Sequence, residues 1–181
     1  WGSKLSPFSG HSYPLLEQNI HLLFPQEKLE DSNYGKIFNN VIQFHKSKNR
    51  PTKKKAKRTW WFKKKKLDRP TLEEMAHEIN EITNFIKFIQ ELMHDLDEAF
   101  HKPNQENIKD FGVMWFFLAG ENPFDFHDKE LFLAKSPLIM QSLSYIHGLS
   151  FQCLNQITHD CYELRDEMSR FNKRKQKQDT R

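Results

Sequence analysis

Apolar residues recur every three or four positions along most of the chain, which is the spacing of an amphipathic helix. The first such pattern predicts a helix over residues 33–47. Pro51 follows within a few residues, and proline is not tolerated inside a helix. We therefore expect the first helix of the folded part to end before residue 50.

The strongest pattern predicts a helix of roughly thirty residues, about 45 Å long at 1.5 Å per residue. It begins at Pro70 or Thr71, and Glu73 and Glu74 suit the positive end of a helix dipole. Pro103 marks its end. One apolar stripe runs down this predicted helix: Leu72, Met75, Ile79, Ile82, Ile86, Ile89, Met93, Leu96 and Phe100.

The second half of the chain carries further helical patterns. Residues 105–119 predict a helix that ends at Gly120, and its apolar run 113–119 predicts burial. We expect a loop and a short helix over 121–137, then another short helix over 137–147. A long helix is predicted after Gly148, with a seam at Leu154, Ile157, Cys161, Leu164, Met168 and Phe171.

These elements predict an all-α protein, an antiparallel bundle of about four main helices. Only 6 glycines occur, and 16 phenylalanines argue against a disordered chain. We expect an N-terminal arm over 1–32, the bundle over 33–176 with a loop at one tip over 46–69, and a basic tail over 177–181. Because the chain starts at Trp1 rather than Met, we expect a processed product or an excised domain.

The net charge of +4 conceals a strong asymmetry. Residues 46–69 contain 13 Lys or Arg and a single acid, a net charge of +12, whereas the rest of the chain carries −8. A basic segment on an acidic body attracts an anionic partner. A solvated linker is the alternative for a run of charge alone.

Three adjacent aromatics, Trp60, Trp61 and Phe62, lie inside this basic segment. Side chains at three consecutive positions cannot all face one core, and the flanking lysines resist burial. Tryptophan favours the membrane interface, where its ring is buried and its N–H stays hydrated. Three partly inserted rings contribute on the order of 5 kcal/mol, and each Lys or Arg near an anionic leaflet adds about 1 kcal/mol. The segment thus predicts a two-signal membrane anchor.

A nucleic-acid partner is the alternative reading of the same segment. The run "KNRPTKKKAKR" over 48–58 resembles a nuclear-import or nucleic-acid-binding sequence, and Trp60 and Trp61 would then stack on bases. Our leading interpretation is an anionic membrane as the partner, with no nucleic acid, and a monomeric protein.

Catalytic and metal-binding patterns are weak. Glu and His recur at i, i+3 in the long helix, but His77 and His94 fall on its polar side, so we expect no metal site. His159 and Cys161 lie close in sequence, yet Cys161 falls on the apolar seam and is predicted to be a buried, inert thiol. We therefore expect no enzyme, no cofactor and no transmembrane span, because the apolar run 113–119 is far too short.

The triplet Trp60-Trp61-Phe62 in a basic loop at the end of a helical bundle resembles the phosphatidylinositol 4-phosphate-binding domain of the SidC/SdcA family of Legionella effectors. The specific match covers about residues 50–72. It implies that the three rings insert into the bilayer and that the domain binds the cytosolic face of a host endomembrane or the pathogen vacuole. The family's ubiquitin-ligase activity belongs to another domain.

The resemblance also implies a cationic pocket for the phosphorylated inositol. An arginine just before the triplet would be Arg58, and one opening the next helix would be Arg69. The family pocket uses a basic residue from a distant helix, for which Arg165 is a candidate. The lysines after the triplet would attract any anionic lipid: Lys63, Lys64, Lys65 and Lys66.

Overall fold

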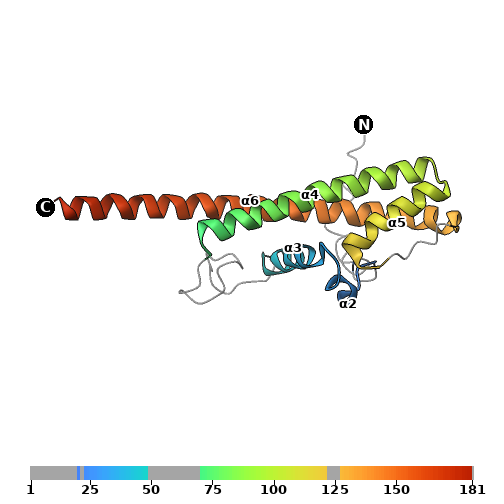
Figure 1. Cartoon of the computed structure of the whole chain (residues 1–181), viewed down its shortest axis with the longest axis horizontal. Coiled ribbons are helices and arrows are strands. Elements are labelled where there is room, and N and C mark those ends of the chain that lie inside the picture. Colours follow the sequence, from blue (N-terminus) through green and yellow to red (C-terminus); the bar gives the residue numbers. More distant parts are fainter. Residues whose placement is uncertain (1–19, 21–22, 49–69, 122–126, 181) are drawn as a thin grey trace, which may run out of the picture.

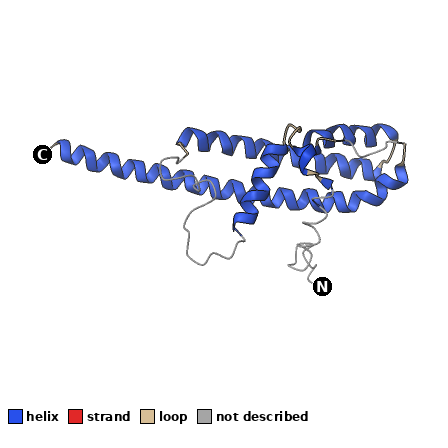
Figure 2. Ribbon diagram, turned by 90° about the horizontal axis from the view of Figure 1, so that it is seen from below, coloured by secondary structure: helices blue, strands red, loops and turns tan. Residues whose placement is uncertain are grey.

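The computed structural model describes residues 20, 23–48, 70–121 and 127–180 (Figure 1). Within these ranges the chain is all-α, as predicted, and has no strand (Figure 2). The helices are α2 (Gln26–Leu29), α3 (Gly35–Lys48), α4 (Leu72–His101), α5 (Gln105–Ala119) and α6 (Lys129–Asp179).

α4 and α6 form the long axis of the molecule. They run antiparallel and share the most extensive packing between any two described helices (Figure 1). α5 turns back beside α4, α3 lies against α5 and α6, and the short α2 lies against α3 and α5. α6 continues well beyond the other helices, so its C-terminal end projects from the body in both views (Figures 1 and 2).

α4 begins where the sequence predicts, because Thr71 and Glu74 form a capping box. The Thr71 hydroxyl accepts a hydrogen bond from the Glu74 N–H at 3.1 Å, and the Thr71 N–H donates to Glu74 Oε2 at 2.8 Å. Two N–H groups that lack a partner within the helix are satisfied in this way. The start of α4 is therefore fixed by its own residues.

α5 also has the predicted bounds. Asn104 caps it by accepting a hydrogen bond from the Asn107 N–H at 2.8 Å. Gly120 ends it in the left-handed region with φ of 74°, and a Cβ there would overlap the Lys28 carbonyl. Only glycine meets both conditions without strain.

The main core surrounds Trp115, which is fully buried. The Phe24 ring lies 4.9 Å from the rings of both Trp115 and Phe38, measured between centroids. Ile20 and Leu29 are buried in the same cluster. The described part of the predicted N-terminal arm is therefore part of the core.

The predicted division of the last third of the chain is wrong. The two short helices expected before Gly148 are instead parts of α6, a single helix of 51 residues that contains Pro137. The expected loop before them falls mostly on residues 122–126, outside the described ranges. Ser136 donates its hydroxyl to the Phe132 carbonyl at 2.7 Å next to the proline. A Cβ on Gly148 would meet nothing within 4 Å, so the glycine marks neither a turn nor a close approach. Packing on both sides of these residues outweighs their low helix propensity.

The predicted burial of several apolar residues is also wrong. Phe100, at the last turn of α4, is 44% exposed. In α5, Val113, Phe116 and Phe117 are exposed on the face opposite Trp115, so this helix is buried on one side only. A second group of exposed residues belongs to the predicted seam of α6: Met168 and Phe171.

Candidate functional site

Most residues of the predicted membrane-binding loop lie outside the described part of the chain. These are Arg58, Trp60, Trp61, Phe62, Lys63, Lys64, Lys65, Lys66 and Arg69. Arg165 alone among the predicted site residues is described, so the predicted pocket stays a prediction. The structure does describe the two helix ends that bound the segment, the C-terminus of α3 and the N-terminus of α4.

A small second core holds these two helix ends against α6. Phe44 of α3 packs with Ile82 and Ile86 of α4 and with Cys153 and Ile157 of α6. All five side chains are nearly inaccessible to solvent. Three helices are thus joined one turn before the end of α3 and about 15 Å along α4 from its start.

Polar contacts add to this anchor. The Tyr145 hydroxyl lies 3.2 Å from His45 Nε2, which joins α6 to the last turn of α3. The Ser47 hydroxyl donates to the Phe44 carbonyl at 2.7 Å. With the Thr71 capping box at the other end, both flanks of the segment are held in place by described contacts.

Acidic side chains lie on α4 and α6 near this anchor. Glu73 and Glu74 lie in the first turn of α4, and Glu163 lies on α6 with a carboxylate oxygen 3.8 Å from His159 Nε2. Asp160 is buried, and its Oδ1 accepts a hydrogen bond from Gln156 Nε2 at 3.1 Å. The start of α4, where the basic segment ends, is therefore acidic.

Arg165 lies beyond the anchor, on the projecting part of α6. It is exposed, and its guanidinium carbon is 5.9 Å from the centroid of the Tyr162 ring. Asp166 follows it directly and Glu163 lies two residues before it, and both acids are exposed. The structure brings no second predicted pocket residue to it within the described ranges.

The thiol chemistry differs from the prediction in one respect. Cys161 is half-buried rather than buried, and Cys153 is the buried thiol. Burial, with a smaller contribution from the negative charge of Glu78, raises the pKa of Cys153 to about 12. Cys153 is thus a protonated, unreactive side chain at neutral pH.

The histidines of α4 are exposed and lie beside acids: His94 is 3.6 Å from the adjacent Asp95, and the other two have an acid one turn away. His77 Nε2 lies 3.2 Å from Glu81, and His101 Nδ1 lies 3.4 Å from Asp97. Two groups place three candidate metal ligands within 4.8 Å of one another: His94, Asp95 and Glu98, and His159, Asp160 and Glu163. Carboxylates beside a histidine on one helix do not by themselves define a metal site, and we assign none.

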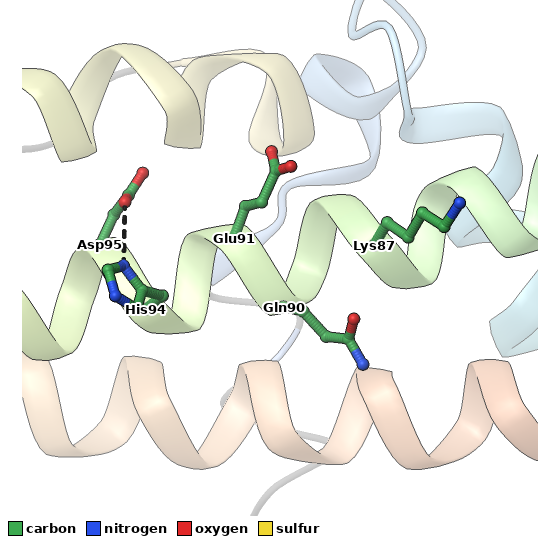
Figure 3. A pocket seen from close by; sticks show the side chains of 5 residues that line it. All are labelled: Lys87, Gln90, Glu91, His94 and Asp95. Atoms are coloured by element: carbon green, nitrogen blue, oxygen red, sulfur yellow. Dashed lines mark ion pairs between the residues drawn. The ribbon is translucent and has the colours of Figure 1, made fainter.

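A shallow pocket of about 340 Å³ lies along α4. Its lining residues all come from this helix, and Figure 3 shows Glu91 and Asp95 directed to one side and Gln90 to the other. Gln90 Nε2 lies 3.1 Å from His147 Nε2 of α6, and burial lowers the pKa of His147. The polar groups diverge, so the pocket lacks the converging contacts of a small-molecule site.

Comparison of the chain with protein-family models, with curated proteins and with solved structures found no significant match. The resemblance to the SidC/SdcA lipid-binding domain therefore stays a prediction. Among the described helices, none combines the length and the hydropathy needed to cross a membrane.

Proposed function

We propose that this chain is a non-enzymatic lipid-binding module that recognises a phosphoinositide, phosphatidylinositol 4-phosphate, on a cytosolic membrane surface. One observation carries the proposal. Trp60, Trp61 and Phe62 lie together inside a segment of net charge +12 on an otherwise acidic body. No cofactor is needed for such binding.

The described structure supports this proposal through the anchor of the segment. α3 and α4 are joined to α6 by the buried cluster around Phe44 and Ile157. Both helix ends are thus ordered before the segment meets a membrane. Binding therefore loses no conformational entropy from these two helices, because folding has already ordered them.

The charge distribution supports the same orientation. An anionic leaflet attracts the basic segment and repels the acidic turn of α4 at Glu73 and Glu74. The attraction acts within about 8 Å at physiological ionic strength. The segment rather than the body should therefore be the part that meets the lipid headgroups.

Each part of the segment has a different role in this proposal. Arginine can grip a phosphate with two parallel hydrogen bonds, whereas lysine acts as a point charge. We assign headgroup selectivity to Arg58 and Arg69, and general attraction to the lysines at 63–66. The three aromatic rings supply the apolar half of the anchor.

Liposome sedimentation tests the proposal directly. The chain should bind vesicles that contain phosphatidylinositol 4-phosphate more tightly than vesicles of the same charge made with phosphatidylserine. Equal failure to bind both vesicle types would refute a membrane function. Arg69→Gln should reduce the difference in affinity between the two vesicle types. An equal loss of affinity for both would show that the pocket assignment is wrong.

The aromatic and basic parts can be separated with salt. Replacement of Trp60, Trp61 and Phe62 by alanine should leave weak binding that disappears at about 0.5 M salt, where the Debye length is about 4 Å. Lys63–66 changed to glutamine should leave binding that depends less on salt. The exposed pair Phe116 and Phe117 of α5, changed to alanine, is the matched control. A large loss of thermal stability in the Trp60/Trp61/Phe62 variant would instead identify those rings as core residues.

The basic run over 48–58 favours one alternative, a nucleic-acid-binding or nuclear-import module. Mobility shifts with single-stranded and duplex nucleic acid at physiological salt distinguish the two functions. Tight, salt-dependent binding of nucleic acid without vesicle affinity would favour this alternative.

A further inference from the structure

The C-terminal part of α6 has no partner helix within the described chain. Asp160 is its last buried residue. From Tyr162 to Thr180 every residue is exposed except the half-buried Leu164. Figure 1 shows this part extending past the start of α4, beyond which no described helix lies beside it. An isolated helix of such length is only marginally stable in water.

The projecting part nevertheless keeps the spacing of a packed helix. Cys161, Leu164, Met168 and Phe171 follow one another at intervals of three, four and three residues. This stripe continues the buried positions Cys153 and Ile157, which pack against α3 and α4. Alternating intervals of three and four are typical of helices that pair in coiled coils. Phe171, at 66% exposure, is the most exposed large apolar side chain in the described ranges.

The charges on this part are divided into two halves. Residues 160–167 carry four acids and only one base, Arg165, whereas residues 168–177 carry five bases and no acid. The acids are Asp160, Glu163, Asp166 and Glu167, and the bases are Arg170, Lys173, Arg174, Lys175 and Lys177. Such a helix complements a copy of itself that runs in the opposite direction, because each acidic half then faces a basic half.

We propose that the projecting part of α6 pairs with the same part of a second copy of this chain, antiparallel and about a two-fold axis. The stripe sets the register. In an antiparallel coiled coil, the a positions of one helix face the d positions of the other. Met168 (a) therefore lies opposite Phe171 (d) of the second copy, and Phe171 lies opposite the second copy's Met168. The axis then passes between Ser169 and Arg170.

This register also fits the exposed length. Cys161 lies opposite Gln178 of the second copy, so the paired helices overlap over 161–178, about 27 Å. The overlap begins directly after Asp160, the last buried residue of α6, and the helix of the second copy ends at Asp179, opposite Asp160. On one side of the seam Glu167 faces Arg174, and Leu164 packs against the aliphatic part of Lys175.

A parallel pair of the same two helices lacks these matches. It would place the acidic half on the acidic half and the five bases on the five bases. Like charges directly across such an interface are destabilising. The charge division thus selects the antiparallel pair, and the isologous contact closes at two copies. This dimer departs from the monomer expected from the sequence.

Disulfide trapping tests both the partner and the direction. Gln178→Cys should form a dimer through two disulfides that join it to the native Cys161 of the second copy. The two thiols in one chain are about 25 Å apart along the helix, so they cannot react with each other. Gln176→Cys, on the opposite face, should form far less of this product. Disulfides of Cys161 with Cys161, identified by mass spectrometry of the linked peptides, would refute the antiparallel direction.

Sedimentation equilibrium of the full chain, from micromolar to near-millimolar concentration, measures the association itself. Met168→Glu should raise the dimer dissociation constant about a hundredfold or more, since the seam loses two apolar side chains by symmetry. Arg174→Glu should weaken the dimer, and the double variant Glu167→Arg/Arg174→Glu should restore it.

The other possible occupants of this face give different outcomes. A monomer at every concentration would overturn the proposal. So would retention of the dimer in Met168→Glu, since the contact would then lie elsewhere. Binding of the monomeric helix to phosphatidylserine vesicles, lost in Met168→Glu, would identify a lipid surface as the occupant instead. The Trp60, Trp61 and Phe62 variant separates this result from the proposed function, because its dimer should be unchanged.

Discussion

Phe24 provides the sharpest test of the fold, because the sequence places it in an arm and the structure places it in the core. Its side chain is 2% exposed. The ring lies 4.9 Å from both Phe38 and Trp115, so it joins the segment before α2 to α3 and α5. Phe24→Ala would remove the ring from between two aromatic partners.

The cost of this change follows from the burial of the ring. Replacement of a fully buried phenylalanine by alanine destabilises a protein by about 3–5 kcal/mol. The two aromatic contacts are expected to place Phe24 in the upper part of this range, since each such pair is worth about 0.5–1.5 kcal/mol beyond its buried area. Phe116→Ala removes the same atoms from a side chain that is 50% exposed, and should cost less than about 1 kcal/mol.

Urea unfolding followed by circular dichroism measures the difference between the two variants. With a slope of about 2 kcal/mol per M, Phe24→Ala should lower the midpoint by on the order of 2 M at unchanged slope. The Phe116→Ala midpoint should stay near that of the parent. If the two variants unfold at the same urea concentration, Phe24 is not a core residue and the packing of this segment on Trp115 is wrong.

Three further outcomes follow from local contacts. Thr71→Ala should cost about 1 kcal/mol by removing the capping box with Glu74, whereas Thr71→Ser should restore most of it in the same unfolding assay. Iodoacetamide at neutral pH should modify Cys161 and leave Cys153 unmodified until the protein unfolds, as mass spectrometry would show; early modification of Cys153 would contradict its burial. Burial, and then the charge of Glu81, raises the pKa of Glu78 above 4.5, so the folded state binds this proton more tightly than the unfolded state. Stability should therefore fall as the pH rises from 4.5 through the raised pKa, and Glu78→Gln should reduce that fall in melting temperature; an unchanged pH profile would contradict the shift.

The sequence predicts the fold class and two helices closely because their ends are fixed by local chemistry. Thr71 and Glu74 determine the start of α4, and Gly120 determines the end of α5 through its positive φ. Such signals act within a few residues, so they can be read without tertiary contacts. Pro137 and Gly148 have equally strong local preferences, but packing along the whole of α6 outweighs them.

Burial is harder to predict from the sequence, because a helical stripe does not reveal whether another helix covers it. Ile157 and Phe171 belong to the same periodic pattern, yet the first is 2% exposed and the second 66%. The difference arises from α4, which begins at Leu72 and leaves the rest of α6 uncovered. Whether a residue of α6 is buried therefore depends on where α4 starts, which the periodic pattern of α6 does not contain. The predicted lipid-binding residues remain predictions for a related reason: they lie between two well-defined helix ends, and only those ends are described.

The anchor of the basic segment and the exposed stripe of α6 begin at the same end of the body. Thr71 is the N-cap of α4 and comes just after the basic segment. The start of α4 is also the point beyond which α6 is exposed. A two-fold axis across the projecting helices would carry a second body, and with it a second basic segment, to the other end of the pair. If that axis is perpendicular to a membrane, symmetry places both segments at the same height above it. The second segment would then bind as an intramolecular event, which strengthens weak anchors by about a hundredfold or more when the geometry permits both contacts. A module whose single anchor is of modest strength would thereby bind a membrane firmly only as a pair.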